Sequence, residues 1–175
     1  MPAADAVFRQ RQSAGMLVCM ADVQFEVRHR FDAPARVVWD ELVDWKGHEH
    51  WVPMTRVDVD PGDSTAVGAR LTAWTGPWRL ALEDRMEVAR CDWDDAEQSG
   101  DCEVTKLGRI LRGRAGFTVE QHDSGAELAW FEDVTMPYTP QFLAPIVGRL
   151  GAAGFGFGMR RLAKLLAQRH LRQST

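Results

Sequence analysis

Four polar side chains fall on strand faces that are otherwise apolar. They are His29, Asp84, Lys106 and Glu132. An isolated charge in apolar surroundings is costly, so such a group pairs with another, forms hydrogen bonds or changes its pKa. A carboxyl group that loses its water becomes harder to ionise and can then act as a general acid or base. Asp84 and Glu132 are therefore candidates for acid–base chemistry or for orienting a polar group of a ligand.

A structural interpretation of these four residues stays open beside the chemical one. They could lie where the strands leave the core, or they could neutralise one another as ion pairs. A buried ion pair is weak evidence for stability, so a role in orienting a ligand remains compatible with pairing. The structural interpretation is favoured most for His29 and Lys106, which lie nearer the ends of their expected strands.

Large apolar residues alternate with the two carboxylates on the same strand faces. We expect a largely apolar pocket lined by Leu82, Met86, Trp130 and Val134. Two aromatic residues are candidates for its opening. Trp51 lies near the end of an expected short helix, and Tyr138, the only tyrosine, lies where the last strand meets the last helix. A core role for Trp51 and a capping role for Tyr138 stay open.

The motifs that would hold a metal or a cofactor are not evident. In His48-Glu49-His50 the imidazoles are two residues apart, so they do not share a helix face, and no third ligand is apparent. The run Gly154-Phe-Gly156-Phe-Gly158 neither follows a strand nor opens a helix, unlike a dinucleotide-binding fingerprint. No catalytic Ser/His/Asp order and no phosphate loop is found. We expect no metal and no cofactor.

Length and composition indicate one globular domain. The chain has 175 residues, a formal net charge of −4 and 45% hydrophobic residues. We expect no integral membrane segment, because no run approaches the roughly 18 consecutive apolar residues of a spanning helix. Three cysteines without metal spacing indicate reduced thiols and a cytoplasmic protein. Cys91 and Cys102 could pair only if their strands meet closely. We interpret residues 1–22 as an N-terminal extension and 23–175 as the domain.

The C-terminal segment is basic. From Val134 to Thr175 it has no acid but six bases, which are Arg149, Arg160, Arg161, Lys164, Arg169 and Arg172. Such a segment could bind nucleic acid or a membrane surface. Cations near a helix C-terminus are also favoured by the helix macrodipole, and we prefer this explanation. We expect no nucleic-acid partner and leave a homodimer open.

Hydrophobic periodicity predicts the order strand, two helices, six strands and one long helix. The strands are expected at 23–31, 56–60, 67–75, 79–92, 102–110, 113–121 and 126–136, with an acidic loop over 92–101. The last helix is expected to begin with Thr139 as N-cap, to run for roughly 30 residues and to bend near Pro145. Its glycines each cost about 1 kcal/mol of helix propensity, so close sheet packing or room for a ligand must favour small residues.

Short hairpins and one apolar face per strand predict an α+β helix-grip fold. In this fold a curved antiparallel sheet of about seven strands is wrapped round the long C-terminal helix. The chain also resembles the START-like superfamily, in the branch of polyketide cyclases, dehydrases and lipid transport proteins. The resemblance spans about residues 23–170 and rests on the order of several segments. They include Phe31-Asp-Ala-Pro-Ala-Arg-Val-Val-Trp39, Asp84-Arg-Met-Glu-Val88, Gly108-Arg-Ile-Leu-Arg-Gly113 and Trp130-Phe-Glu132.

The resemblance implies a hydrophobic cavity between sheet and helix, but no catalytic role for any residue. The first functional hypothesis is therefore a protein that binds a small hydrophobic or aromatic molecule. The second is a cyclase or dehydratase that uses Glu132 or Asp84 as its acid or base. The third is a module that binds a protein or lipid surface through the basic C-terminal helix.

Overall fold

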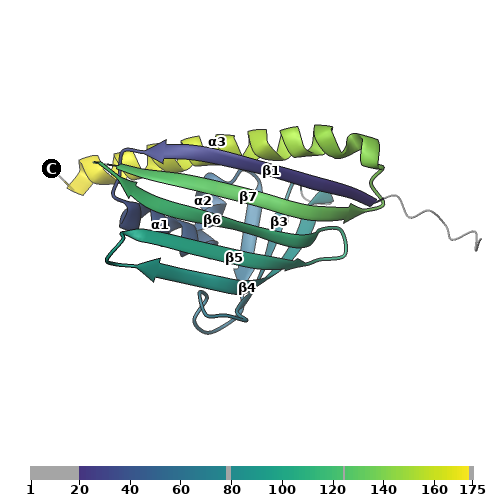
Figure 1. Ribbon diagram of the computed structural model, residues 1–175, viewed down its shortest axis with the longest axis horizontal. Helices are drawn as coiled ribbons and strands as arrows, with labels where there is room; N and C mark the ends of the chain where they lie inside the picture. Colours follow the sequence, from purple (N-terminus) through teal and green to yellow (C-terminus); the bar gives the residue numbers. More distant parts are fainter. Residues whose placement is uncertain (1–19, 78–79, 124, 174–175) are drawn as a thin grey trace, which may run out of the picture.

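The computed structural model describes residues 20–77, 80–123 and 125–173, and Figure 1 shows its helices and strands. In chain order these are β1 (Met20–Phe31), α1 (Ala35–Val43), η1 (Trp45–Gly47), α2 (His48–Trp51), β2 (Thr55–Val59), β3 (Arg70–Thr75), β4 (Leu82–Asp94), β5 (Ser99–Leu107), β6 (Arg112–His122), β7 (Gly125–Pro137), η3 (Gln141–Leu143) and α3 (Ala144–Gln173). The predicted α+β helix-grip architecture is confirmed.

The strands form one antiparallel sheet in the order β1-β7-β6-β5-β4-β3-β2. Strands β2 to β6 each pair with the next strand along the chain, whereas β1 closes the far edge by pairing with β7. The register of β4 against β5 shifts between Val88 and Arg90, and such a bulge bends a strand and increases its twist. In Figure 1 the sheet curves and α3 runs along β1, with α1 and α2 on the same side.

Helix α3 approaches the sheet closely because its first half is rich in glycine. A Cβ atom added at Gly151 would lie only 2.7 Å from the ring of Phe25 on β1. A Cβ atom added at Gly158 would lie 3.4 Å from the ring of Trp51 on α2. In contrast, a Cβ atom at Gly154 would meet no atom within 4 Å. The expected close packing is confirmed at Gly151, whereas Gly154 borders open space whose use by a ligand stays a prediction.

The buried side chains form two separate clusters. The larger one joins α1, α2 and the second half of α3 to the middle of the sheet, and it includes Phe117, Leu128 and Met159. The smaller one, near the start of α3, consists of Ala21, Val23, Val134 and Ala144. Two clusters rather than one continuous core leave space between them under α3.

The start of the last helix differs from the expectation. Helix α3 begins at Ala144, after a short 3-10 helix at 141–143, and Pro140 rather than Thr139 precedes that turn without a side-chain cap. Pro145 is thus the second residue of α3, where its missing N–H needs no partner. The predicted N-cap is wrong, and Pro145 lies in the first turn of α3, which a proline fits.

The loop predicted over 92–101 is mostly strand. Strand β4 continues to Asp94 and β5 begins at Ser99, with Asp92 opposite Asp101 in the register. The acidic residues obscured the alternation, because they lie on the outer face while Gly100 and Cys102 face the core. Cys91 and Cys102 are direct register partners and both are free thiols.

Residues 1–19 of the expected extension lie outside the described residues, and β1 begins at Met20, before the expected domain start.

The segment Gln141–Arg169 is long and apolar enough to cross a membrane by length and composition alone. The expectation of no membrane-spanning segment rested on consecutive apolar residues, and scattered glycines and basic residues interrupt every such run here. Core helices of globular domains pass the same test. Here 22% of the most apolar window of the segment is buried, and Met159 and Leu162 of α3 are fully buried in the larger cluster.

Candidate functional site

A cavity of about 420 Å³ lies between α3, α2 and the inner face of the sheet. Its volume falls within the range of roughly 300–1,000 Å³ that small-molecule sites occupy. The walls are mainly apolar, and the side chains that come from strands β1, β4 and β7 and from α3 include Phe25, Leu82, Val134, Met136 and Phe155. The cavity occupies the space between the two buried clusters, since Val23 of the smaller cluster and Trp51 of the larger one both line it.

Three charged side chains meet in the wall of this cavity. The Nζ atom of Lys106 lies 2.5 Å from Oδ2 of Asp84 and 3.1 Å from Oε2 of Glu132. The side chains of Lys106 and Glu132 are only 4% and 7% exposed, and that of Asp84 is 15% exposed. The indole Nε1 of Trp130 donates a hydrogen bond of 3.3 Å to the other oxygen of Glu132. We call Asp84, Lys106 and Glu132 the buried triad.

The buried triad depends on the register of four strands. Asp84 comes from β4, Lys106 from β5 and Glu132 from β7, so Lys106 must reach across β6 to contact Glu132. Alternate strands are about 10 Å apart, which a lysine side chain can span only if nothing large lies between. The residues of β6 that pair with Lys106 and Glu132 are Gly113 and Ala115, and both are small.

The electrostatics of the buried triad follow from burial and from one positive charge between two carboxyl groups. Burial lowers the pKa of Lys106, but Glu132 and Asp84 outweigh that effect and hold it above its ordinary value. Burial raises the pKa of Glu132 above its ordinary value, and the opposing attraction of Lys106 does not cancel this. The buried triad therefore favours a charged lysine and makes a neutral Glu132 accessible, as general acid–base chemistry requires.

A second, smaller chamber of about 70 Å³ adjoins the cavity. The buried triad lines both spaces, together with Val52, Thr75 and Phe155. Met86 and Trp130 line the smaller chamber, where the Trp130 ring stacks on Phe117 with centroids 5.4 Å apart. The polar groups thus lie where a large apolar space narrows to a small one.

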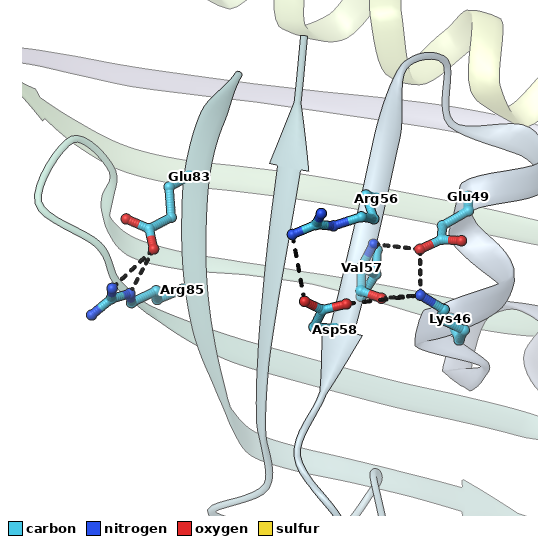
Figure 2. A network of polar contacts seen from close by, with 7 residues as sticks. All are labelled: Lys46, Glu49, Arg56, Val57, Asp58, Glu83 and Arg85. Carbon is cyan, nitrogen blue, oxygen red and sulfur yellow. Dashed lines mark hydrogen bonds and ion pairs between the residues drawn. The ribbon is translucent and has the colours of Figure 1, made fainter. Parts of the chain in front are cut away.

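Helix α2 is fixed to the edge strand β2, which positions Trp51 over the cavity. Figure 2 shows Glu49 of α2 between Lys46 and the backbone of Val57. The carboxylate of Glu49 lies 2.6 Å from Nζ of Lys46 and accepts a 2.8 Å hydrogen bond from the N–H of Val57. Nζ of Lys46 also donates to the carbonyl of Val57 at 2.7 Å. Trp51, at the end of this anchored helix, is fully buried and lines the cavity.

His48, in the same helix, is a core residue. Its Nε2 donates a 2.8 Å hydrogen bond to the carbonyl oxygen of Leu42, and its ring lies 4.5 Å from that of Trp51. Burial lowers the pKa of His48 to about 4, so the imidazole is neutral near pH 7. This histidine supports the wall behind Trp51.

Two polar atoms in the cavity wall stand out among the described residues. Nε1 of Trp51 and Oδ1 of Asp84 are both buried and have no hydrogen-bond partner. A buried polar atom without a partner costs about 1–3 kcal/mol, and buried polar groups are paired in most proteins. Both atoms belong to residues that line the same cavity.

The structure brings most of the predicted site residues together. Those that line the larger cavity are Trp51, Leu82, Asp84, Lys106, Glu132 and Val134. Met86 and Trp130 line the adjoining chamber. His29 and Tyr138 line neither space: His29 is half-buried with its ring against Phe31, and Tyr138 is 78% exposed just beyond β7. Binding of a ligand by any of these residues stays a prediction.

Sequence reasoning missed part of the lining. Val23 and Phe25 share the inner face of β1 with His29. The prediction selected His29 because it is polar, but the cavity is lined by Val23 and Phe25, nearer the start of that strand. Phe155 on α3 lines both spaces and contacts the Trp130 ring at a centroid distance of 4.8 Å. The glycines at 151, 154 and 158 also line the cavity, and their density in an amphipathic helix was the signal.

Comparison with known proteins supports the fold. No protein-family model matches the chain, and no curated protein matches it. Among solved structures, a protein of Thermus thermophilus is 14% identical with a TM-score of 0.63, covering 83% of this chain and 98% of its own. A START superfamily protein from Mycobacterium smegmatis is 13% identical with a TM-score of 0.59, covering 83% and 97%. Ara h 8.0201 is 15% identical with a TM-score of 0.52, covering 82% and 99%. The chain has a START-like fold, as its sequence segments indicated.

Proposed function

We propose that this protein binds one small hydrophobic or aromatic molecule in the cavity between α3 and the sheet. The observation that carries the proposal is an apolar cavity of about 420 Å³ with a few buried polar groups in its wall. Apolar area supplies affinity in such sites, and a few fixed polar groups supply orientation. The START-like fold supports the same proposal, because a cavity between sheet and helix is what the resemblance implies.

The packing of the cavity wall also supports binding. Apolar packing alone would make a stronger core than the buried triad, because desolvation of charges offsets much of their attraction. Likewise, glycine at position 154 leaves open space at a helical site where alanine would give a more stable helix. Both features sacrifice stability at the cavity, which is understandable if the cavity has a ligand.

Native mass spectrometry tests this proposal. The purified protein would be exposed to a small-molecule extract of the cells that encode it, and its mass would be measured under non-denaturing conditions. We expect one additional small molecule per chain, released by organic solvent and absent after unfolding. A protein that keeps its bare mass throughout would contradict the proposal.

The second candidate is catalysis by a cyclase- or dehydratase-type enzyme, and the buried triad is the observation that favours it. A carboxyl group whose pKa is raised by burial can hold a proton near a carbonyl-bearing ring and return it. Glu132→Gln keeps the shape and removes the charge. Binding without turnover in the wild type supports a binding protein, whereas turnover that Glu132→Gln abolishes while binding persists supports the enzyme.

We further propose a cytoplasmic location, which the two free thiols Cys91 and Cys102 support because disulfides persist in oxidising compartments. They lie opposite each other in the register of β4 and β5. A homodimer, the absence of a nucleic-acid partner and binding through the basic face of α3 stay predictions. Light scattering and salt-dependent binding assays test them.

A further inference from the structure

One oxygen atom of the buried triad has no hydrogen-bond partner among the described residues. Oδ2 of Asp84 and Oε2 of Glu132 contact the Lys106 ammonium, and Oε1 of Glu132 accepts from Trp130. The remaining contact of Nζ of Lys106 is a weak one of 4.0 Å to the sulfur of Met86. Oδ1 of Asp84 is itself buried, although the Asp84 side chain as a whole is 15% exposed, and it lacks a partner among the described residues. A carboxylate oxygen can only accept a hydrogen bond, so the missing partner is a donor.

The charge balance selects the same kind of partner. Two carboxyl groups face one lysine, so the buried triad is neutral or carries a negative charge, depending on the proton of Glu132. No positive charge in it is left for an anion. A ligand carboxylate would meet like charge in a site with little water, where repulsion is strong.

The indole of Trp51 adds a requirement for an acceptor. Its Nε1 is a donor only, is buried, and has no partner among the described residues, and the residue lines the same cavity as Asp84. A hydroxyl group can donate to one neighbour and accept from another. A methyl ether can only accept, and a carboxylate can only accept while adding negative charge.

Building on the proposed function, we propose that the ligand is an uncharged apolar molecule with a hydroxyl group that donates to Asp84, and that carboxylates are disfavoured. The hydroxyl completes the hydrogen bonds of the buried triad, while the apolar part of the ligand lies against Phe25, Val134 and Phe155. Sterol-like, phenolic and long-chain alcohols share this chemistry, whereas fatty acids do not.

Four matched probes test the proposal by calorimetry near neutral pH. They are 2-naphthol, 2-methoxynaphthalene, 2-methylnaphthalene and 2-naphthoate, which share one ring system and differ in the polar group. A hydrogen bond to a charged acceptor is stronger than one between neutral groups, so we expect 2-naphthol to bind at least about tenfold more tightly than 2-methoxynaphthalene. We expect 2-naphthoate to bind more weakly than 2-methylnaphthalene.

Asp84→Asn then changes the order of affinities. The Lys106 ammonium attracts the amide oxygen, so Asn presents its N–H₂ to the cavity and favours acceptors. The advantage of 2-naphthol should shrink and 2-naphthoate should gain. Asp101→Asn, an exposed carboxylate paired with Arg90 on the outer face, is the control and should leave all four affinities unchanged.

The outcomes separate the two proposals. If no probe binds to the wild-type protein, the proposed function fails. If the apolar probe binds but 2-naphthol gains nothing over its methyl ether, or 2-naphthoate binds most tightly, the hydroxyl proposal is wrong and the proposed function stands. The wild-type series decides this even if Asp84→Asn does not fold.

Discussion

Nζ of Lys106 lies 2.5 Å from Oδ2 of Asp84, on the neighbouring strand, in the wall of an apolar cavity. Both residues were predicted to lie on the inner face of the sheet from the alternation of apolar and polar residues alone, and the contact joins them as an ion pair. Glu132 completes the group at 3.1 Å from the same nitrogen. The same three residues therefore form ion pairs with one another and line the cavity.

The first prediction concerns removal of the positive charge. Lys106→Met leaves two buried carboxyl groups without their cation, so we expect a loss of about 3–5 kcal/mol in the free energy of unfolding. Arg90→Met is the matched control, because Arg90 pairs with Asp101 between the same two strands but on the exposed face. We expect it to cost less than about 1 kcal/mol. Urea unfolding measures both.

A triple replacement completes this comparison. Combining Lys106→Met with Asp84→Leu and Glu132→Leu removes every buried charge, so stability should recover well above that of Lys106→Met alone. A triple variant that is less stable than the single variant would show that the buried triad is needed for folding rather than for a ligand.

The second prediction concerns acid. Burial lowers the pKa of His48 from 6.5 to about 4, so between these values the unfolded chain binds a proton that the folded protein does not. Stability therefore falls as the pH drops through this window, by about 3 kcal/mol for the full shift. Urea unfolding at several pH values should show a smaller fall for His48→Gln, with His50→Gln as the exposed control. If the free energy of unfolding fell equally with pH in the wild type and in His48→Gln, His48 would not be the cause of the loss of stability in acid.

The third prediction concerns the glycines of α3. Gly154→Ala should raise the free energy of unfolding by up to about 1 kcal/mol, because alanine favours the helix and the new methyl group meets no atom within 4 Å. Gly156→Ala should give a similar gain, since its Cβ atom would have only ordinary contacts, at 3.7 Å and beyond. Thermal or urea unfolding compares them. Destabilisation by Gly154→Ala would mean that the space beside it is closed.

The sequence predicted the succession of elements along the chain and the inner face of the sheet, because strand alternation has a fixed period of two, but it did not predict that β1 pairs with β7. Asp84 and Glu132 were placed on that face by counting from Leu82 and Trp130, and both line the cavity. The same counting placed His29 on the inner face of β1, where it is half-buried. Alternation shows which face of the sheet a side chain lies on, but not how far along the strand the cavity extends. It therefore could not show that His29 lies beyond the cavity lining.

Ion pairing among these polar residues was one interpretation of the sequence, but which of them meet could not be predicted. Lys106 reaches Glu132 across β6 because Gly113 and Ala115 are small, and this depends on the registers of β5 with β6 and of β6 with β7. A register is set by hairpin geometry, which single-sequence patterns define poorly. The exposure of Tyr138 was equally hidden from the sequence: the residue is 78% exposed just after β7, in a left-handed backbone with φ of 68°.

The most direct test of ligand binding in the cavity is a fluorescence titration with N-phenyl-1-naphthylamine, a neutral probe that becomes brighter in apolar surroundings. The wild-type protein should bind it saturably at one site per chain. Gly154→Leu fills the open space beside α3 and should weaken binding at least about tenfold, whereas Gly156→Ala, outside the cavity lining, should bind like the wild type. Equal binding by wild type and Gly154→Leu, with both proteins folded by circular dichroism, would contradict a ligand site between α3 and the sheet.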